Sequence, residues 1–107
     1  MKKIYTILAF AIGFSINAQI ATNGTNPSGT DASAMGYQTT ASGIASTAMG
    51  GYYTTASGTL STAMGNGTFA SGTASTAMGS FTIASGIVST AMGSNTKASD
   101  FGSLVIG

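Results

Sequence analysis

Very few residues in this sequence could carry out chemistry. The chain has 107 residues and contains no Cys and no His, so thiolate and imidazole catalysis are excluded. Its two carboxylates, Asp31 and Asp100, are 69 positions apart (100 − 31). Paired-acid catalysis needs carboxyl groups within about 10 Å of each other, and the repeat described below separates these two by about five coils. The sequence therefore predicts no enzyme, and neither catalytic, cofactor-binding nor metal-binding residues.

The charge pattern excludes other classes of function. Charged residues make up 5% of the chain, against about 25% in average proteins. Lys2 and Lys3 supply two of the three basic residues, so no basic patch remains for nucleic acid. Calcium-binding β-rolls repeat an Asp in every turn, which this chain does not. We interpret Lys97 as a solubilising surface charge. The Gly-Asn-Gly stretch at 65–67 has no P-loop Lys-Ser/Thr pair after it and predicts a turn.

Two short motifs alternate along the chain. STAMG occupies residues 46–50, 61–65, 75–79 and 89–93, with ASAMG at 32–36 and SLVIG at 103–107 in the same frame. The central residues of these copies are separated by 14, 15, 14, 14 and 14 positions. Between them lies the motif TxASG, at 39–43, 54–58, 68–72, 82–86 and, as TKASD, 96–100. The single 15-residue step comes from one residue added within 50–55. Such a regular repeat is typical of a rod rather than of an active site.

The repeat predicts an all-β fold, a parallel β-solenoid with two strands in each coil. Frequent Gly disfavours a helix, whereas five residues suit a short strand and two suit a tight turn. By alternation, Ser46, Ala48 and Gly50 share one face, and Thr47 and Met49 share the other. The second strand's outer column ends in Lys97, so Thr39, Ala41 and their equivalents should line a thin interior. About six coils are expected.

One apolar column has two possible positions. Its members never change to a polar residue, and they are Met35, Met49, Met64, Met78, Met92 and Ile106. If they point inward, they are the core of the roll. If they point outward, they form a continuous apolar stripe that implies a partner. The small inward residues leave little room for Met, which favours the outward orientation and burial around an axis shared by identical chains.

Several aromatic residues fall in predicted turns or on the variable outer column. They are Tyr37, Tyr52, Tyr53, Phe69 and Phe81. Each either packs locally over the thin rod or contacts a ligand. Tyr52 and Tyr53 lie beside the added residue and are the best candidates for ligand contact.

The first residues resemble a secretory signal peptide. Two Lys are followed by an apolar run at 4–16 that is too short to span a bilayer, and then by Asn-Ala-Gln. Cleavage is expected after Ala18, so that residues 1–18 are the signal peptide and 19–107 are the exported repeat domain.

The alternation of SxAxG with xxASG on a 14-residue period resembles the head repeats of YadA-like trimeric autotransporter adhesins. The resemblance covers residues 20–107, with Met where Ile or Val is more usual in the family. It implies a left-handed parallel β-roll, a parallel homotrimer, exposure on a bacterial outer membrane, and adhesion to host matrix or other cells. The neck, stalk and membrane barrel of the family are not seen, so we expect a fragment of a longer protein.

The sequence therefore predicts a non-enzymatic adhesin head module that also acts as a rigid spacer. Its expected partners are further copies of itself and an extracellular-matrix protein or another cell surface, with no nucleic acid and no small-molecule substrate. It is expected at the cell surface or secreted. One alternative is a structural fibre segment of a secreted protein that ends in a chaperone or anchor domain. Another is an ice-binding solenoid that uses its Thr ladders.

Overall fold

The STAMG copies form one six-stranded parallel sheet, called here the long-strand sheet. In the computed structural model the described residues are 23–107, and the predicted signal peptide lies outside them. Each strand pairs in register with the copy one coil away, so that Met49 is opposite Met64 and Ala48 opposite Ala63. The strands are β2 (Ser33–Gly36), β4 (Thr47–Gly51), β6 (Thr62–Asn66), β8 (Thr76–Ser80), β10 (Thr90–Ser94) and β12 (Leu104–Ile106).

The TxASG copies form a second parallel sheet, the short-strand sheet, and its strands are shorter than the five residues predicted. The Ser-Gly half of the motif already belongs to the turn, because the N–H groups of Ser42 and Gly43 both donate to the carbonyl oxygen of Ala56, at 2.9 and 3.3 Å. The six strands are β1 (Asn26–Pro27), β3 (Thr40–Ala41), β5 (Thr55–Ala56), β7 (Phe69–Ala70), β9 (Ile83–Ala84) and β11 (Lys97–Ala98).

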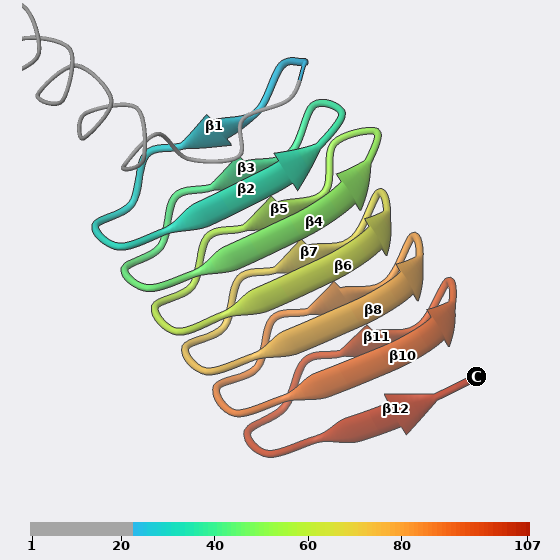
Figure 1. Ribbon diagram of the computed structural model, residues 1–107. Coiled ribbons are helices and arrows are strands. Elements are labelled where there is room, and N and C mark those ends of the chain that lie inside the picture. The colour runs from blue at the N-terminus through green and yellow to red at the C-terminus, as the bar shows by residue number, and fades with distance from the viewer. Residues whose placement is uncertain (1–22) are drawn as a thin grey trace, which may run out of the picture.

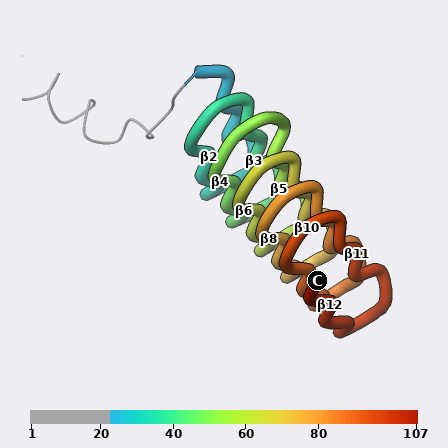
Figure 2. The backbone as a smooth tube through the Cα atoms, turned by 90° about the vertical axis from the view of Figure 1, so that its right-hand side faces the viewer, coloured from blue at the N-terminus to red at the C-terminus, as the bar shows by residue number. Residues whose placement is uncertain are grey.

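The two sheets alternate along the chain, so each coil contributes one strand to each sheet and six coils stack side by side (Figures 1 and 2). This arrangement confirms the predicted all-β parallel solenoid. In both sheets hydrogen bonds run only between neighbouring coils in parallel register. The architecture therefore depends on contacts between equivalent residues of successive repeats.

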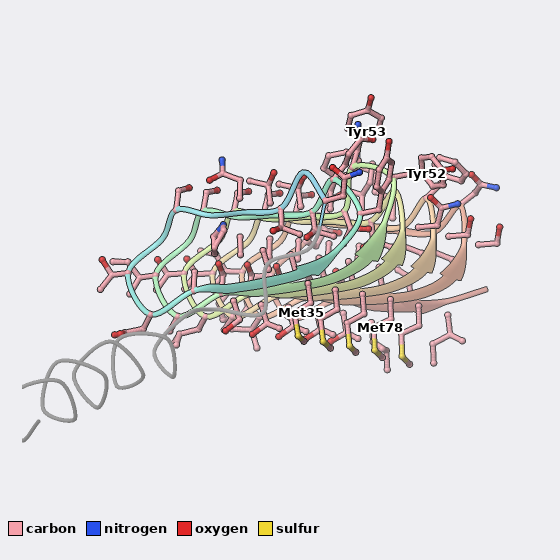
Figure 3. All side chains as sticks on the ribbon, turned by 45° about the horizontal axis from the view of Figure 1, so that its top comes forward. Met35, Tyr52, Tyr53 and Met78 are labelled. Atoms are coloured by element: carbon pink, nitrogen blue, oxygen red, sulfur yellow. The ribbon has the colours of Figure 1, made fainter. Side chains whose placement is uncertain are left out.

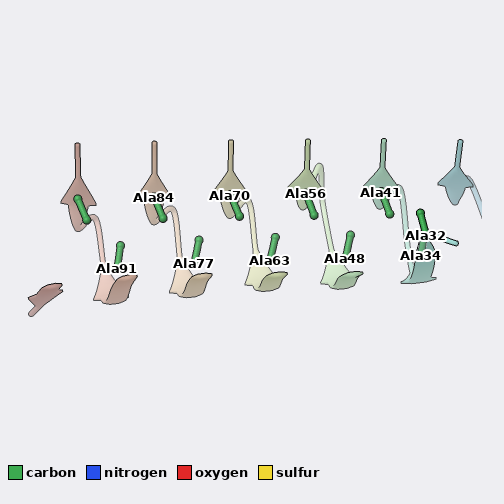
Figure 4. Close-up of a cluster of buried hydrophobic side chains, with 11 residues drawn as sticks. Ala32, Ala34, Ala41, Ala48, Ala56, Ala63, Ala70, Ala77, Ala84 and Ala91 are labelled. Atoms are coloured by element: carbon green, nitrogen blue, oxygen red, sulfur yellow. The ribbon is translucent and has the colours of Figure 1, made fainter. Parts of the chain in front are cut away.

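The interior is thin and is lined by small side chains. Alanines from the two sheets face each other across it (Figure 4), and Val105 of the last coil packs against them. The buried alanines are Ala32, Ala34, Ala41, Ala48, Ala56, Ala63, Ala70, Ala77, Ala84, Ala91 and Ala98. Thr39 and Ser46 and their equivalents are also buried. The predicted inward orientation is thus correct for Ser46 and Ala48, whereas Gly50, with a φ of 130°, is exposed.

Most of the buried hydroxyl groups make no hydrogen bond among the described residues. The Ser46 hydroxyl is an exception and donates to the carbonyl oxygen of Gly43, at 2.7 Å. Ser61 and Ser75 occupy the same position in later repeats, and their hydroxyls have no partner among the described residues. A buried hydroxyl without a partner costs stability, so the bonded hydroxyls contribute more to the roll than their unbonded equivalents.

Both corners of the coil contain residues in the left-handed conformation. Before the long strands these are Asp31, Ala45, Leu60, Ala74, Val88 and Gly102, and before the short strands Gly24, Gln38, Tyr52, Tyr53, Gly67, Phe81 and Asn95. Left-handed backbone costs about 1–2 kcal/mol for a residue with a Cβ. From Gln38 onward, each corner offsets that cost with a hydrogen bond to the preceding coil, for example from the N–H of Ala74 to the carbonyl oxygen of Thr59, at 2.7 Å. The backbone conformation of these corners therefore depends on hydrogen bonds to the neighbouring coil.

Close backbone approach at one corner requires glycine. A Cβ placed on Gly72 would overlap the carbonyl oxygen of Gly86 and would lie 2.6 Å from its carbonyl carbon. Gly43, Gly58 and Gly86 are crowded in the same way by the following coil. Successive coils therefore approach so closely at this corner that even one methyl group does not fit between them.

We predict that Gly72→Ala destabilises the roll, whereas Gly51→Ala does not. Gly72 has no positive φ, so the effect is steric, and overpacking costs about 1–3 kcal/mol. A Cβ on Gly51 meets nothing within 4 Å, and at a permissive φ Gly→Ala stabilises by about 0.4–1 kcal/mol. Urea denaturation followed by circular dichroism measures both. Equal stability of the two variants would show that the coils are not in this close contact.

Candidate interaction surfaces

The outer face of the long-strand sheet carries two parallel columns of side chains. Thr47 and Met49 of β4 are both half-buried and lie on the side opposite the buried Ala48. Figure 3 shows Met35 and Met78 on this outer side, with their sulfur atoms directed away from the interior. The column Met35, Met49, Met64, Met78, Met92 and Ile106 is called here the methionine column. It is not part of the alanine core, so the inward alternative for these residues does not describe the structure.

This face is continuous and uncharged. Register pairing places each Met beside the Met of the next coil, and Ile106 beside Met92. The neighbouring column holds Ser33, Thr47, Thr62, Thr76, Thr90 and Leu104. None of the six strands contains an Asp, Glu, Lys or Arg. A continuous stripe of this kind is typical of an interaction surface.

A second set of exposed apolar side chains lies at the corner that precedes the long strands. Its members are Ile44, Leu60, Ile87, Val88 and Phe101. The sequence does not mark the four aliphatic members as a site, because the positions between the motifs also hold Thr59, Thr73 and Ala74 in other repeats. Only the stacking of the coils shows that these alternating residues line one corner.

The opposite corner carries an aromatic cluster, the aromatic corner, made of Tyr37, Tyr52 and Tyr53. The rings of Tyr37 and Tyr52 come from successive coils and pack edge to face, with their centroids 5.4 Å apart. Tyr52 and Tyr53 are 63% and 65% exposed, and both project from the roll on the side away from the methionines (Figure 3). The structure therefore brings together three of the five predicted aromatic residues as exposed neighbours at one corner.

The other two predicted aromatic residues occupy different positions. The ring of Phe81 lies over Gly67 of the preceding coil, where an added Cβ would be 3.0 Å from the ring carbons. Phe69 lies on the outer face of the short-strand sheet, in the column of Thr55, Ile83 and Lys97. This column faces solvent, as the presence of Lys97 predicted. Phe69 is thus on a sheet face, and not in the turn that holds the tyrosines.

Thr54 holds the corner at the added residue. Its hydroxyl lies 3.0 Å from the carbonyl oxygen of Gly51 and 3.0 Å from that of Gly65 in the next coil, and can donate to either. Tyr52 and Tyr53 lie between Gly51 and Thr54, both with positive φ. The N–H of Tyr53 donates to the carbonyl oxygen of Gln38, at 3.1 Å. These bonds fix the two-residue projection to both neighbouring coils.

The charged residues of the described part do not form a site. Asp31 and Asp100 lie in the turns before β2 and β12, the two edge strands of the long-strand sheet. Within residues 23–107 there is no group of three or more His, Cys, Asp or Glu residues close enough to hold a metal ion. The same residues contain no helix of sufficient length and apolar character to cross a bilayer.

The coil geometry defines a parallel β-roll built from a repeat of about 14 residues. The sequence matches the model of the YadA head domain repeat, which contains two repeat copies, over residues 28–52, 56–82 and 84–107. The chain belongs to the YadA head family, which is a structural adhesin family and not a known family of enzymes. Among curated proteins, none matches the sequence. The family assignment confirms the resemblance found from the two alternating motifs.

We predict that Thr54→Val destabilises the roll more than Thr68→Val. Thr68 is the equivalent residue one coil later, and its hydroxyl has no partner among the described residues. Valine keeps the shape of threonine, so only the hydrogen bond is lost, at a cost of about 1 kcal/mol. Thermal unfolding of both variants measures the difference. A larger loss at Thr68 would contradict the role given to Thr54.

Proposed function

We propose that this chain is a non-enzymatic adhesin head module, displayed at a cell surface and assembled as a homotrimer through the outer face of its long-strand sheet. The observation that carries the proposal is the continuous, uncharged face of threonines and methionines on a chain of the YadA head family. In the trimer, the three methionine columns meet along a common axis. The expected left-handed coil and export by a signal peptide belong to the same proposal.

Burial of the methionine column supplies the driving force for assembly. A fully buried Met side chain contributes about 1.5–3 kcal/mol relative to an exposed one, and the column repeats this contribution in each coil. The half-buried state in a single chain means that part of each side chain already contacts its neighbours in the stack. The remaining exposed part is the area that a second and third copy would cover.

Adhesion is assigned to the aromatic corner. Tyr52 and Tyr53 project to the side opposite the methionines (Figure 3), so assembly through the methionine face leaves them accessible. Aromatic residues supply much of the binding energy at protein interfaces. A matrix protein or another cell surface is the partner proposed here. The rigid stack of coils holds this corner at a fixed distance from whatever carries the head.

The sequence analysis left two other functions open, a fibre segment and an ice-binding solenoid, and the structure bears on them differently. A fibre segment would have the same fold and assembly but no receptor, and binding experiments separate it from an adhesin. The ice-binding alternative depended on regular Thr ladders. The column that includes Thr39, Thr54 and Thr68 is buried, so it cannot order water, and the remaining ladder alternates with methionine on the face assigned to assembly.

We predict that Met64→Lys prevents trimer formation. Three ammonium groups would be buried at the axis without partners, which costs far more than the Met contacts gain. Ser71→Lys is the control, since Ser71 is exposed and lies directly after a strand of the short-strand sheet, in which Lys97 already faces solvent. Size-exclusion chromatography with light scattering gives the oligomeric state. A monomeric parent protein, or an unchanged trimer with Met64→Lys, would contradict the proposed assembly.

We predict that replacing Tyr52 and Tyr53 together with Ser lowers adhesion at least tenfold, because an aromatic hot spot contributes about 2 kcal/mol or more. Leu60→Ser, at the opposite corner and similarly exposed, is the control. Binding of purified protein to immobilised extracellular matrix and to cultured cells measures the effect. If the parent itself does not bind, the fibre function is favoured, and if the double variant binds normally, the aromatic corner is not the site.

A further inference from the structure

The methionine column places the most readily oxidised side chains of the described residues on one surface. The chain has no Cys and no Trp, and five of its six methionines form this column. Oxidation converts a flexible apolar thioether into a polar sulfoxide, and methionine sulfoxide reductases reverse the change. The last position of the column, Ile106, has no sulfur. Oxidation that alters a single methionine in an ordinary core would therefore alter the whole outer face of the long-strand sheet here.

The sulfur atoms are accessible and closely spaced. All five methionines are half-buried in the single chain and none belongs to the alanine core, and Figure 3 shows Met35 and Met78 with their sulfur atoms directed outward. Neighbouring parallel strands lie about 4.8 Å apart, and the methionines are in register on them. A sulfoxide on Met64 would thus be a direct neighbour of Met49 and Met78.

We propose that the methionine column is an oxidation site that controls assembly of the chain. In the free chain, a thioether sulfur attacks one oxygen of a peroxide. The O–O bond breaks, the sulfur loses two electrons and becomes a sulfoxide, and hydrogen peroxide is reduced to water. An oxidised chain no longer assembles through this face. The inference rests on the homotrimer proposed above and adds the regulation of that surface.

The polar S=O group of a sulfoxide opposes assembly. In the free chain water hydrates it, but at an apolar axis it would be buried without a hydrogen-bond donor, which is unfavourable. The column repeats in five coils, so several sulfoxides act on one interface. Assembly in turn covers the sulfur atoms, so that oxidation and assembly compete for the same surface.

The fold of the single roll should survive this reaction. The interior contains alanine, serine, threonine and glycine, and the coils are joined by backbone hydrogen bonds. None of these groups reacts readily with peroxide. Loss of assembly with an unchanged roll therefore separates a surface effect from general damage.

The test compares the parent protein with a variant in which Met35, Met49, Met64, Met78 and Met92 are all replaced by Ile. Both are diluted until dissociated, treated with hydrogen peroxide, concentrated again and examined by light scattering, circular dichroism and peptide mass spectrometry. We expect the parent to gain one oxygen at each column methionine, keep its β spectrum and lose the trimer peak, while the variant still assembles. Methionine sulfoxide reductase should restore the parent.

The outcomes separate the two proposals. If the parent is monomeric before peroxide is added, the assembly is wrong and this inference falls with it. If the parent is a trimer and its oxidised form, with sulfoxides mapped to the column, reassembles as fully as before, only the oxidation control is overturned. If the parent and the Met→Ile variant lose assembly equally, the methionines are not the cause, and the inference is again wrong.

Discussion

In-register contact between identical coils is the constraint on which the rest of this structure depends. Parallel pairing places each residue directly beside its equivalent in the next repeat, and two corners of the coil bring backbone against backbone. The interior is lined by Ala, Ser and Thr, and a Cβ does not fit at Gly72, where the next coil approaches. Larger inward side chains are confined to the last coil, in which Val105 packs against the alanines.

Because the coils are in register, a residue type that is repeated at one position of the coil forms a continuous column on the surface. The five methionines therefore form a stripe along the sheet rather than five separate contacts. In-register pairing also explains why the one added residue of the repeat lies at a corner. The added residue beside Tyr52 and Tyr53 changes a turn, where Thr54 and Gln38 supply hydrogen bonds to it. An insertion within a strand would reverse the faces of every residue that follows.

The candidate functional features of this molecule are columns and corners on its surface. The described residues bring no group of acids or metal ligands together, and the chain belongs to a family of structural adhesin domains. The methionine face and the aromatic corner lie on opposite sides of one rigid stack (Figure 3). The assembly and the adhesion proposed above would therefore use different surfaces of the same repeat without interfering with each other.

The sequence by itself determined the period, the two strands in each coil and the placing of Ala48 and Met49 on opposite faces of their strand, because alternation and repetition are local properties of the chain. It did not determine that the methionines lie outside the alanine core, that the TxASG strands shorten to two residues, or that the rings of Tyr37 and Tyr52 pack together. These features depend on hydrogen bonds and contacts with the adjacent coil. Tertiary structure decided them because the partner of each turn lies about fourteen residues away in the chain, where local preference has no influence.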